Sequence, residues 1–261
     1  MKRYSLRGSV FCEGSFVRKK SGVFAQMKKR SEFLNGAVSG IPIALGYLSV
    51  SFGFGIMAVS AGLTLFEAFM ISLTNLTSAG QAQGVLVIAS GGTLIEMALV
   101  QLVINIRYSL MALSLSQKLD KSFTFPHRLL AAYGITDEIF AVCSTKEGTL
   151  SPSYMYGVIT VSTAGWVLGT FLGGAAGELL PKAISSALGI VLYGMFIAII
   201  IPPAGKHKNI LFVVAAAAAM STAVHYLLPS VSGGFSVILC GIAASVLGAL
   251  IFPQKDEEAE K

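Results

Sequence analysis

The chain has 261 residues, of which 54% are hydrophobic and only 12% are charged, and its mean hydropathy is +0.74. Because soluble domains carry about 25% charged residues, this composition excludes an ordinary soluble protein and predicts an integral membrane protein. Nine of the 19 Lys and Arg residues behind the net charge of +6 precede Asn35, and a basic flank before the first span favours a cytoplasmic N-terminus over a nucleic-acid-binding arm.

The predicted elements are consecutive apolar segments, each close to the roughly 20 residues that a helix needs to cross a bilayer. Before them, residues 1–35 form a basic cytoplasmic tail that we expect to be disordered, with Met27 as an alternative start of the protein. Residues 36–252 form one transmembrane domain, and residues 253–261 form a charged C-terminal tail. The apolar segments lie near residues 37–59, 65–90, 93–115, 126–144, 154–178, 183–203, 209–228 and 233–252. The sequence therefore predicts an all-α polytopic integral membrane protein with seven or eight transmembrane helices.

The positions of the Lys and Arg residues leave two topologies open. If all eight segments cross, Lys206, Lys208 and the C-terminal tail are cytoplasmic, as the positive-inside rule requires, but the loop from Lys118 to Arg128 lies outside. If residues 65–90 instead enter and leave on one side, that loop moves inside, and Lys206, Lys208 and the C-terminus move outside. We take eight spans as the working interpretation.

The second segment contains a polar stretch, SLTNLTSAGQAQG, at residues 72–84. Within hydrocarbon every backbone polar group needs an internal partner, so a stretch rich in Gly, Ser, Thr and Asn is tolerated only where it faces protein or a water-filled cavity. We therefore predict that this segment is interrupted and that the break lines a substrate cavity. The alternative is that its small polar residues only pack against neighbouring helices. The candidate substrate-binding residues are Asn75, Thr77, Ser78, Gly80, Gln81 and Gln83, with Gln101 and Asn105 on the third segment.

Three charged residues lie within predicted spans: Arg107, Asp137 and Glu138. Charges at membrane depth are costly, so they usually form pairs or line a polar pathway. Two interpretations remain open here. Either carboxylate forms an ion pair with Arg107, or one of them carries a coupling proton. For the second role we favour Asp137, because its shorter side chain is easier to hold in a fixed geometry beside Thr136.

Helical spacing on the third segment groups its polar side chains. Gln101, Asn105 and Tyr108 follow i, i+4, i+7 spacing and therefore share one face of a helix. Arg107 is predicted to point away from that face.

The fifth segment carries a glycine every four residues, at Gly165, Gly169, Gly173 and Gly177. This spacing gives one smooth helix face, which allows another backbone to approach closely. The neighbour is either another span of this chain or a separate small membrane subunit.

Catalytic and metal-binding patterns do not emerge from the sequence. The three cysteines, Cys12, Cys143 and Cys240, are scattered, so their spacing suggests neither a metal site nor a disulfide framework. No nucleophile, base or phosphate-binding loop appears in a supporting context. We expect a protein that is not an enzyme and that needs no metal or cofactor.

Four motifs, GIPIALGY, SAGQAQ, NIRYSLMALSLSQ and ITDEIFA, occur in this order between about Asn35 and Phe252. In them the chain resembles the AzlC family, the large subunit of bacterial branched-chain amino acid exporters. The resemblance implies a multi-pass permease of the bacterial inner membrane that works with a small AzlD-type membrane subunit. It also implies export of valine, leucine or isoleucine by use of the proton gradient. The chain departs from the family patterns NLRH and AGAAQ, because it has Asn105–Tyr108 as NIRY and Ala79–Gln83 as AGQAQ.

Two functions from different classes follow from these observations. The first is secondary export of small hydrophobic amino acids by the domain of residues 36–252, whose polar break would bind the zwitterion. The second is a non-transporting membrane scaffold or a channel-like subunit, in which the polar stretch only joins helices.

Overall fold

The computed structural model describes residues 10–177, 194, 197–198 and 200–253, with side chains described from Arg30 onward. In these residues the regular structure is helical, and one isolated β-bridge joins Leu119 to Leu150. The helices are α1 (Val10–Ser60), α2 (Leu65–Thr74), α3 (Ala79–Ala89), α4 (Leu94–Ser116), α5 (Phe125–Tyr133), α6 (Asp137–Thr145), α7 (Pro152–Gly177), α9 (Lys208–Leu227) and α10 (Gly233–Ile251). The predicted all-α class is therefore confirmed for the described part of the chain.

Five helices in the described residues are long and apolar enough to cross a membrane. They are Arg30–Ser60 of α1, together with α4, α7, α9 and α10. The predicted segment at residues 183–203 lies largely outside the described residues, so the total of seven or eight spans stays a prediction.

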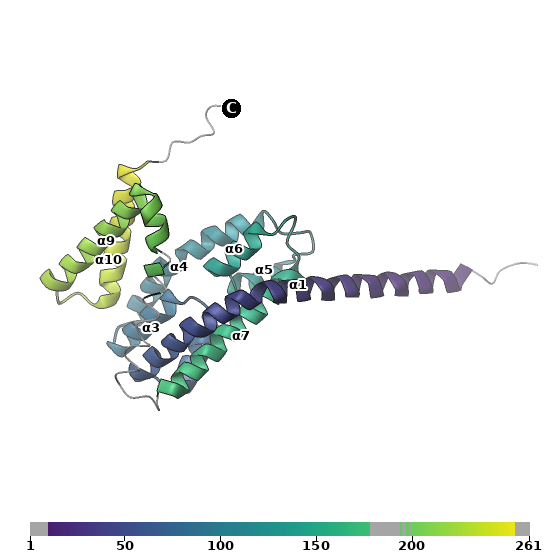
Figure 1. Cartoon of the computed structure of the whole chain (residues 1–261), viewed down its shortest axis with the longest axis horizontal. Helices are drawn as coiled ribbons and strands as arrows, with labels where there is room; N and C mark the ends of the chain where they lie inside the picture. Colours follow the sequence, from purple (N-terminus) through teal and green to yellow (C-terminus); the bar gives the residue numbers. More distant parts are fainter. Residues whose placement is uncertain (1–9, 178–193, 195–196, 199, 254–261) are drawn as a thin grey trace, which may run out of the picture.

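The first helix differs from the sequence prediction at its N-terminal end. α1 begins at Val10, whereas a disordered tail was expected through residue 35. Between residues 10 and 35 there is no proline, so no residue removes a helical N–H group, and the backbone can continue from the membrane span into the basic region. The helix is seen as the long purple rod in Figure 1.

The central packing unit is the pair α1 and α7, which run side by side (Figure 1). The glycines predicted to form a smooth face lie on this contact: a Cβ at Gly165, Gly169 or Gly173 would overlap the backbone of α1. Gly177 is less tight, since its Cβ would lie 3.4 Å from the Cα of Ile56. The close helix contact is thus confirmed, and the neighbour is a span of the same chain.

The second segment is interrupted, as predicted. α2 ends at Thr74 and α3 begins at Ala79, with the capping residues Asn75 and Ser78 outside helical geometry. The regular helix stops here because the hydroxyl and amide side chains offer local partners to the backbone; Thr74 Oγ1, for example, donates to the carbonyl of Met70 at 2.7 Å. Within the break, Thr77 Oγ1 donates to Asn75 Oδ1 at 2.9 Å.

A second interruption corrects the sequence prediction of one span over residues 126–144. α5 ends before Gly134, and α6 begins after the extended residue Thr136, whose hydroxyl accepts from the Ile139 N–H at 3.3 Å. Asp137 and Glu138 therefore occupy the first turn of α6 rather than the middle of a span. Carboxylates in this position are favoured by the helix dipole.

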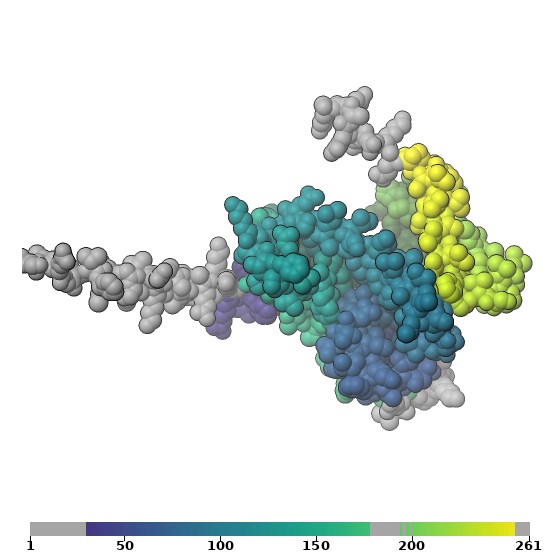
Figure 2. All heavy atoms as spheres, turned by 180° about the vertical axis from the view of Figure 1, so that it is seen from behind, coloured from purple at the N-terminus to yellow at the C-terminus, as the bar shows by residue number. Residues whose placement is uncertain are grey.

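The last two helices form a hairpin on one flank of the molecule, where α10 packs against both α9 and α4 (Figure 2). α9 has no buried residue among those described, whereas α10 buries several. Glu96, in the first turn of α4, is only 3% exposed and accepts a hydrogen bond from the hydroxyl of Ser232, the N-cap of α10. This buried contact fastens the hairpin to the rest of the chain.

Candidate functional site

A narrow pocket lies where the two helix breaks meet. The α2–α3 break and the first turn of α6 supply most of its wall, and α1, α4 and α7 supply aromatic rings. The lining residues are Tyr47, Leu76, Ser78, Tyr108, Thr136, Asp137, Glu138 and Trp166. Two discontinuous helices around one pocket are the arrangement that transporters use to bind substrates within the membrane.

The wall at the α2–α3 break presents an uncapped helix N-terminus. Ser78 precedes α3, and its side chain makes no capping hydrogen bond to the N–H groups of that helix. Its φ of 40° is the one positive φ among the non-glycine residues that the structure describes. Strained backbone of this kind occurs mainly at functional sites. The Gly80 N–H donates to the Thr77 carbonyl at 3.1 Å, and the other N–H groups of the first turn of α3, with the positive end of the helix dipole, can bind an anionic group.

A chain of amide groups supports this break from α4. Gln101 Nε2 donates to the carbonyl of Gly80 at 2.8 Å, and Asn105 Nδ2 donates to Gln101 Oε1 at 2.9 Å. The predicted shared face of Gln101 and Asn105 is thus used to hold α3 against α4. These two residues do not line the pocket themselves.

Some of the other candidate residues of the break lie at the pocket, and the rest lie away from it. Ser78 lines the pocket, with Thr77 and Asn75 bonded to each other beside it. Gln81 lies elsewhere, since it is 1% exposed and donates to Ser72 Oγ at 3.1 Å. Ser72 in turn lies 2.7 Å from the hydroxyl of Thr170 on α7. Gln83, Gln81 and Gly80 do not line the pocket.

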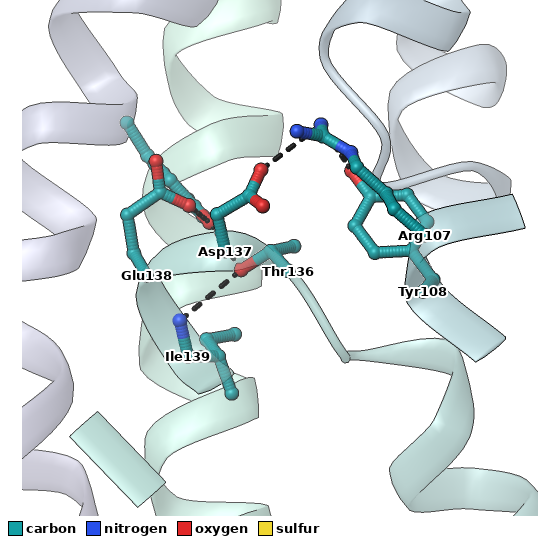
Figure 3. Close-up of polar contacts among 7 residues, drawn as sticks. Arg107, Tyr108, Thr136, Asp137, Glu138 and Ile139 are labelled. Carbon is teal, nitrogen blue, oxygen red and sulfur yellow. Dashed lines mark hydrogen bonds and ion pairs between the residues drawn. The ribbon is translucent and has the colours of Figure 1, made fainter. Parts of the chain in front are cut away.

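Opposite the break, Asp137 forms an ion pair with Arg107 at 2.9 Å (Figure 3). The side chains are 33% and 40% exposed, so the pair is half-buried. Arg107 was predicted to point away from the face of Gln101, Asn105 and Tyr108. It nevertheless contacts Tyr108 of that face: its Nη2 donates to the Tyr108 hydroxyl at 3.3 Å, and its guanidinium lies 5.1 Å from the centre of that ring. The long arginine side chain can turn along its helix, which a count of helical positions does not capture.

Glu138 has different partners, although it is next to Asp137. The hydroxyl of Tyr47 on α1 lies 2.6 Å from Glu138 Oε2 and 2.5 Å from Thr136 Oγ1. Tyr47 is 5% exposed, and its ring packs edge-on against Trp166 at a centroid distance of 5.2 Å. Figure 3 shows Glu138 on the side of Asp137 that is remote from Arg107.

Five residues of this pocket were not among the candidate site residues of the sequence: Tyr47, Leu76, Tyr108, Thr136 and Trp166. Four of them give no chemical signal in a sequence, because an apolar or aromatic residue in a span is ordinarily core. Thr136 could have been found, since Thr followed by two acidic residues is typical of a helix start.

The pocket is small in this conformation. About 10 Å³ of its space is accessible to the centre of a water molecule, which is close to what one water needs. An amino acid would require the surrounding helices to separate. In the described residues no group of three or more His, Cys, Asp and Glu side chains is placed to hold a metal ion.

Comparison with known proteins places the chain in a family. A family model described as AzlC protein matches residues 42–180, more than half of the 261 residues. The chain belongs to the AzlC family. The resemblance found in the sequence motifs is thereby confirmed.

Two relatives illustrate how far the AzlC-family likeness extends. The inner membrane protein YgaZ of Escherichia coli is 27% identical over 226 residues, which are 84% of this chain and 90% of the relative. An uncharacterized membrane protein of Archaeoglobus fulgidus is 31% identical over 184 residues, 69% of this chain and 80% of the relative. No solved structure matches the chain.

The match to the AzlC model also bears on the site. All the lining residues of the pocket, from Tyr47 to Trp166, lie within residues 42–180. The hairpin of α9 and α10 lies outside that range. The pocket between the helix breaks is therefore part of the region that defines this AzlC-family membrane protein.

Proposed function

We propose that this AzlC-family protein is the large subunit of a secondary active exporter for branched-chain or similar small hydrophobic amino acids. The observation that carries this proposal is that one pocket has an uncapped helix N-terminus on one wall and two carboxylates on another. An α-amino acid needs both: its carboxylate suits the N–H groups at the start of α3, and its ammonium suits the acidic turn of α6.

The remaining lining residues suit an apolar substrate side chain. Leu76 and Trp166 are 4% and 2% exposed, and both face the pocket. Trp166 Nε1 has no hydrogen-bond partner among the described residues, so a substrate or water oxygen could accept from it. With space for only one water, the pocket corresponds to a closed state, and transport would require it to open to each side in turn.

The wider assignment follows from the family. We propose a bacterial cytoplasmic membrane location with the N-terminus in the cytoplasm, coupling to protons, and an AzlD-type small subunit as partner. The many exposed apolar side chains of α9 and α10 suit contact with lipid or with such a subunit. No enzymatic step, metal or cofactor enters this mechanism.

The test is counterflow of labelled leucine and valine in proteoliposomes that contain the chain together with its small subunit. Unlabelled isoleucine should compete, whereas leucinamide, which lacks the carboxylate, and isocaproate, which lacks the ammonium, should not. Competition by either analogue would contradict recognition of a zwitterion. Absence of counterflow for every amino acid tried would favour the alternative of a scaffold or channel-like subunit.

A substitution in the break tests the role of the amide chain. A Cβ added at Gly80 would lie 2.5 Å from Thr77 Oγ1, 2.8 Å from Gln101 Oε1 and 3.1 Å from Asn105 Nδ2, so Gly80→Ala must displace the ends of these three side chains. We expect counterflow to fall about tenfold or more, which corresponds to 1.4 kcal/mol of weakened binding, while the variant still folds, because flexible side-chain ends can move. At Gly84 the nearest atom would be Gln101 Nε2, 3.3 Å away, so an added methyl group presses only lightly on the same amide chain. Gly84→Ala is therefore the control for a milder displacement and should retain most of the transport; equal losses in both variants would contradict the expectation that the loss follows the displacement of these side chains.

A further inference from the structure

We infer that Glu138, rather than Asp137, is the carboxylate at which a proton and the ammonium group of the substrate replace one another. This inference rests on the proposed export function and names the residue that would couple it to protons. It reverses the preference for Asp137 that the sequence alone suggests.

The first step concerns charge. The ion pair with Arg107 compensates the charge of Asp137, so adding a proton to Asp137 would leave an arginine uncompensated in a half-buried site. No cationic side chain of the described residues forms an ion pair with Glu138. Because the charges of Arg107 and Asp137 cancel, the pocket carries the single negative charge of Glu138. One proton or one ammonium group neutralises this charge, and the two cannot bind the Glu138 carboxylate together.

The second step concerns the neighbours of Glu138. The titratable groups that line the pocket with Glu138 are Tyr47 from α1, Tyr108 from α4 and Asp137 beside it. Arg107 of α4 lies beyond Asp137, with which it is paired (Figure 3). α7 contributes Trp166, which does not titrate. The environment thus contains one cation, which already has an anionic partner. The exchangeable charge on this wall is that of Glu138.

The third step concerns hydrogen bonds. The Tyr47 hydroxyl has one hydrogen and two neighbours, Glu138 Oε2 at 2.6 Å and Thr136 Oγ1 at 2.5 Å. When Glu138 is ionised it can only accept, so Tyr47 donates to it and Thr136 donates to Tyr47. When Glu138 is protonated it can donate to Tyr47, and Tyr47 then donates to Thr136. The chain of three groups accommodates both states without moving heavy atoms.

The exchange of a proton for the ammonium group conserves both protons and charge. On the side where protons are scarce, protonated Glu138 releases its proton to water as the substrate ammonium enters. On the other side a proton from water binds the carboxylate, and the ammonium leaves with its substrate. One positive charge replaces the other at each step, so proton entry drives amino acid export. By linkage, the substrate must bind more weakly as the proton concentration rises.

The experiment measures proton release and binding together, using the purified complex in lightly buffered detergent solution with leucine as the probe. The wild type should release protons when leucine is added, and its affinity for leucine should fall as the pH is lowered. Glu138→Gln should bind leucine weakly, with loss of both proton release and pH dependence. Glu138→Asp, which keeps the carboxylate, should restore both. Tyr47→Phe should keep proton release but shift the pH midpoint of binding, because Glu138 loses a donor.

Infrared difference spectroscopy without substrate separates this inference from the proposed function. As the pH is lowered, the wild type should gain the C=O stretch of a protonated carboxyl group, and this band should be missing from Glu138→Gln but present in Asp137→Asn. Loss of the band in Asp137→Asn alone, or proton release that persists in Glu138→Gln, would overturn the inference. If leucine does not bind the wild type at all, the proposed function fails, and the infrared band still decides whether Glu138 takes up the proton.

Discussion

Replacing Gly169 or Gly173 by leucine is expected to destabilise the protein severely. A Cβ at Gly169 would lie 2.9 Å from the Cα of Leu48, and one at Gly173 would lie 2.8 Å from the Cα of Phe52. These neighbours are backbone atoms of α1, so they cannot turn away as a side chain can, and the two helices must separate. Forcing extra atoms into a packed contact costs about 1–3 kcal/mol and occasionally more. The loss should appear as a lower thermal midpoint and a smaller monodisperse fraction after purification in detergent.

The matched control is Gly46→Leu on α1. An added Cβ at Gly46 meets no atom within 4 Å, and leucine has the better helix propensity, so this variant should be at least as stable as the wild type. If Gly169→Leu and Gly173→Leu purify with the stability of Gly46→Leu, the contact between α1 and α7 does not depend on these glycines.

The glycine contact could be predicted from the sequence because the signal is local and periodic. Four glycines at a spacing of four residues define one face of a helix whatever surrounds it, and such a face allows the backbone of another helix to approach closely. The identity of the neighbour could not be predicted. It depends on how α1, more than 100 residues earlier in the chain, is placed in space.

The two helix breaks show a similar limit. The break after Thr74 was predicted because many small polar residues occur together at residues 72–84. The break at residues 134–136 was missed, because apolar residues on both sides keep the hydropathy high, and the interruption depends on a single glycine and one capping threonine. A hydropathy profile averages over such short features.

Only part of the candidate site could be predicted from the sequence. The sequence singled out Ser78 and the charged residues of α4 and α6, but it could not assign a partner to each carboxylate. Asp137 and Glu138 are adjacent in the chain, and only the placement of Tyr47 and Arg107 on two different helices distinguishes them. This distinction decides which of the two can exchange a proton without leaving a charge unpaired.

The ion pair yields the second strong prediction. On the sequence alone, Asp137→Asn is expected to abolish proton-driven export and to spare exchange. The structure leads us to expect that Asp137→Asn and Arg107→Gln each reduce both modes of transport and lower the thermal midpoint, because each leaves the partner's charge uncompensated. Breaking one partner of a charge pair is generally more harmful than removing both.

The double variant Arg107→Gln with Asp137→Asn should therefore be more stable than either single variant. Coupling energies between contacting residues run from about 0.5 to 3 kcal/mol, and the lower part of this range is expected here, because the side chains are 40% and 33% exposed and solvent screens exposed pairs. A double-mutant cycle in thermal or denaturant unfolding measures this term. Strictly additive losses would mean that the pair contributes nothing to the fold. If the double variant is more stable than the single variants and its affinity for leucine still depends on pH, the exchangeable proton lies on the carboxylate that remains, Glu138.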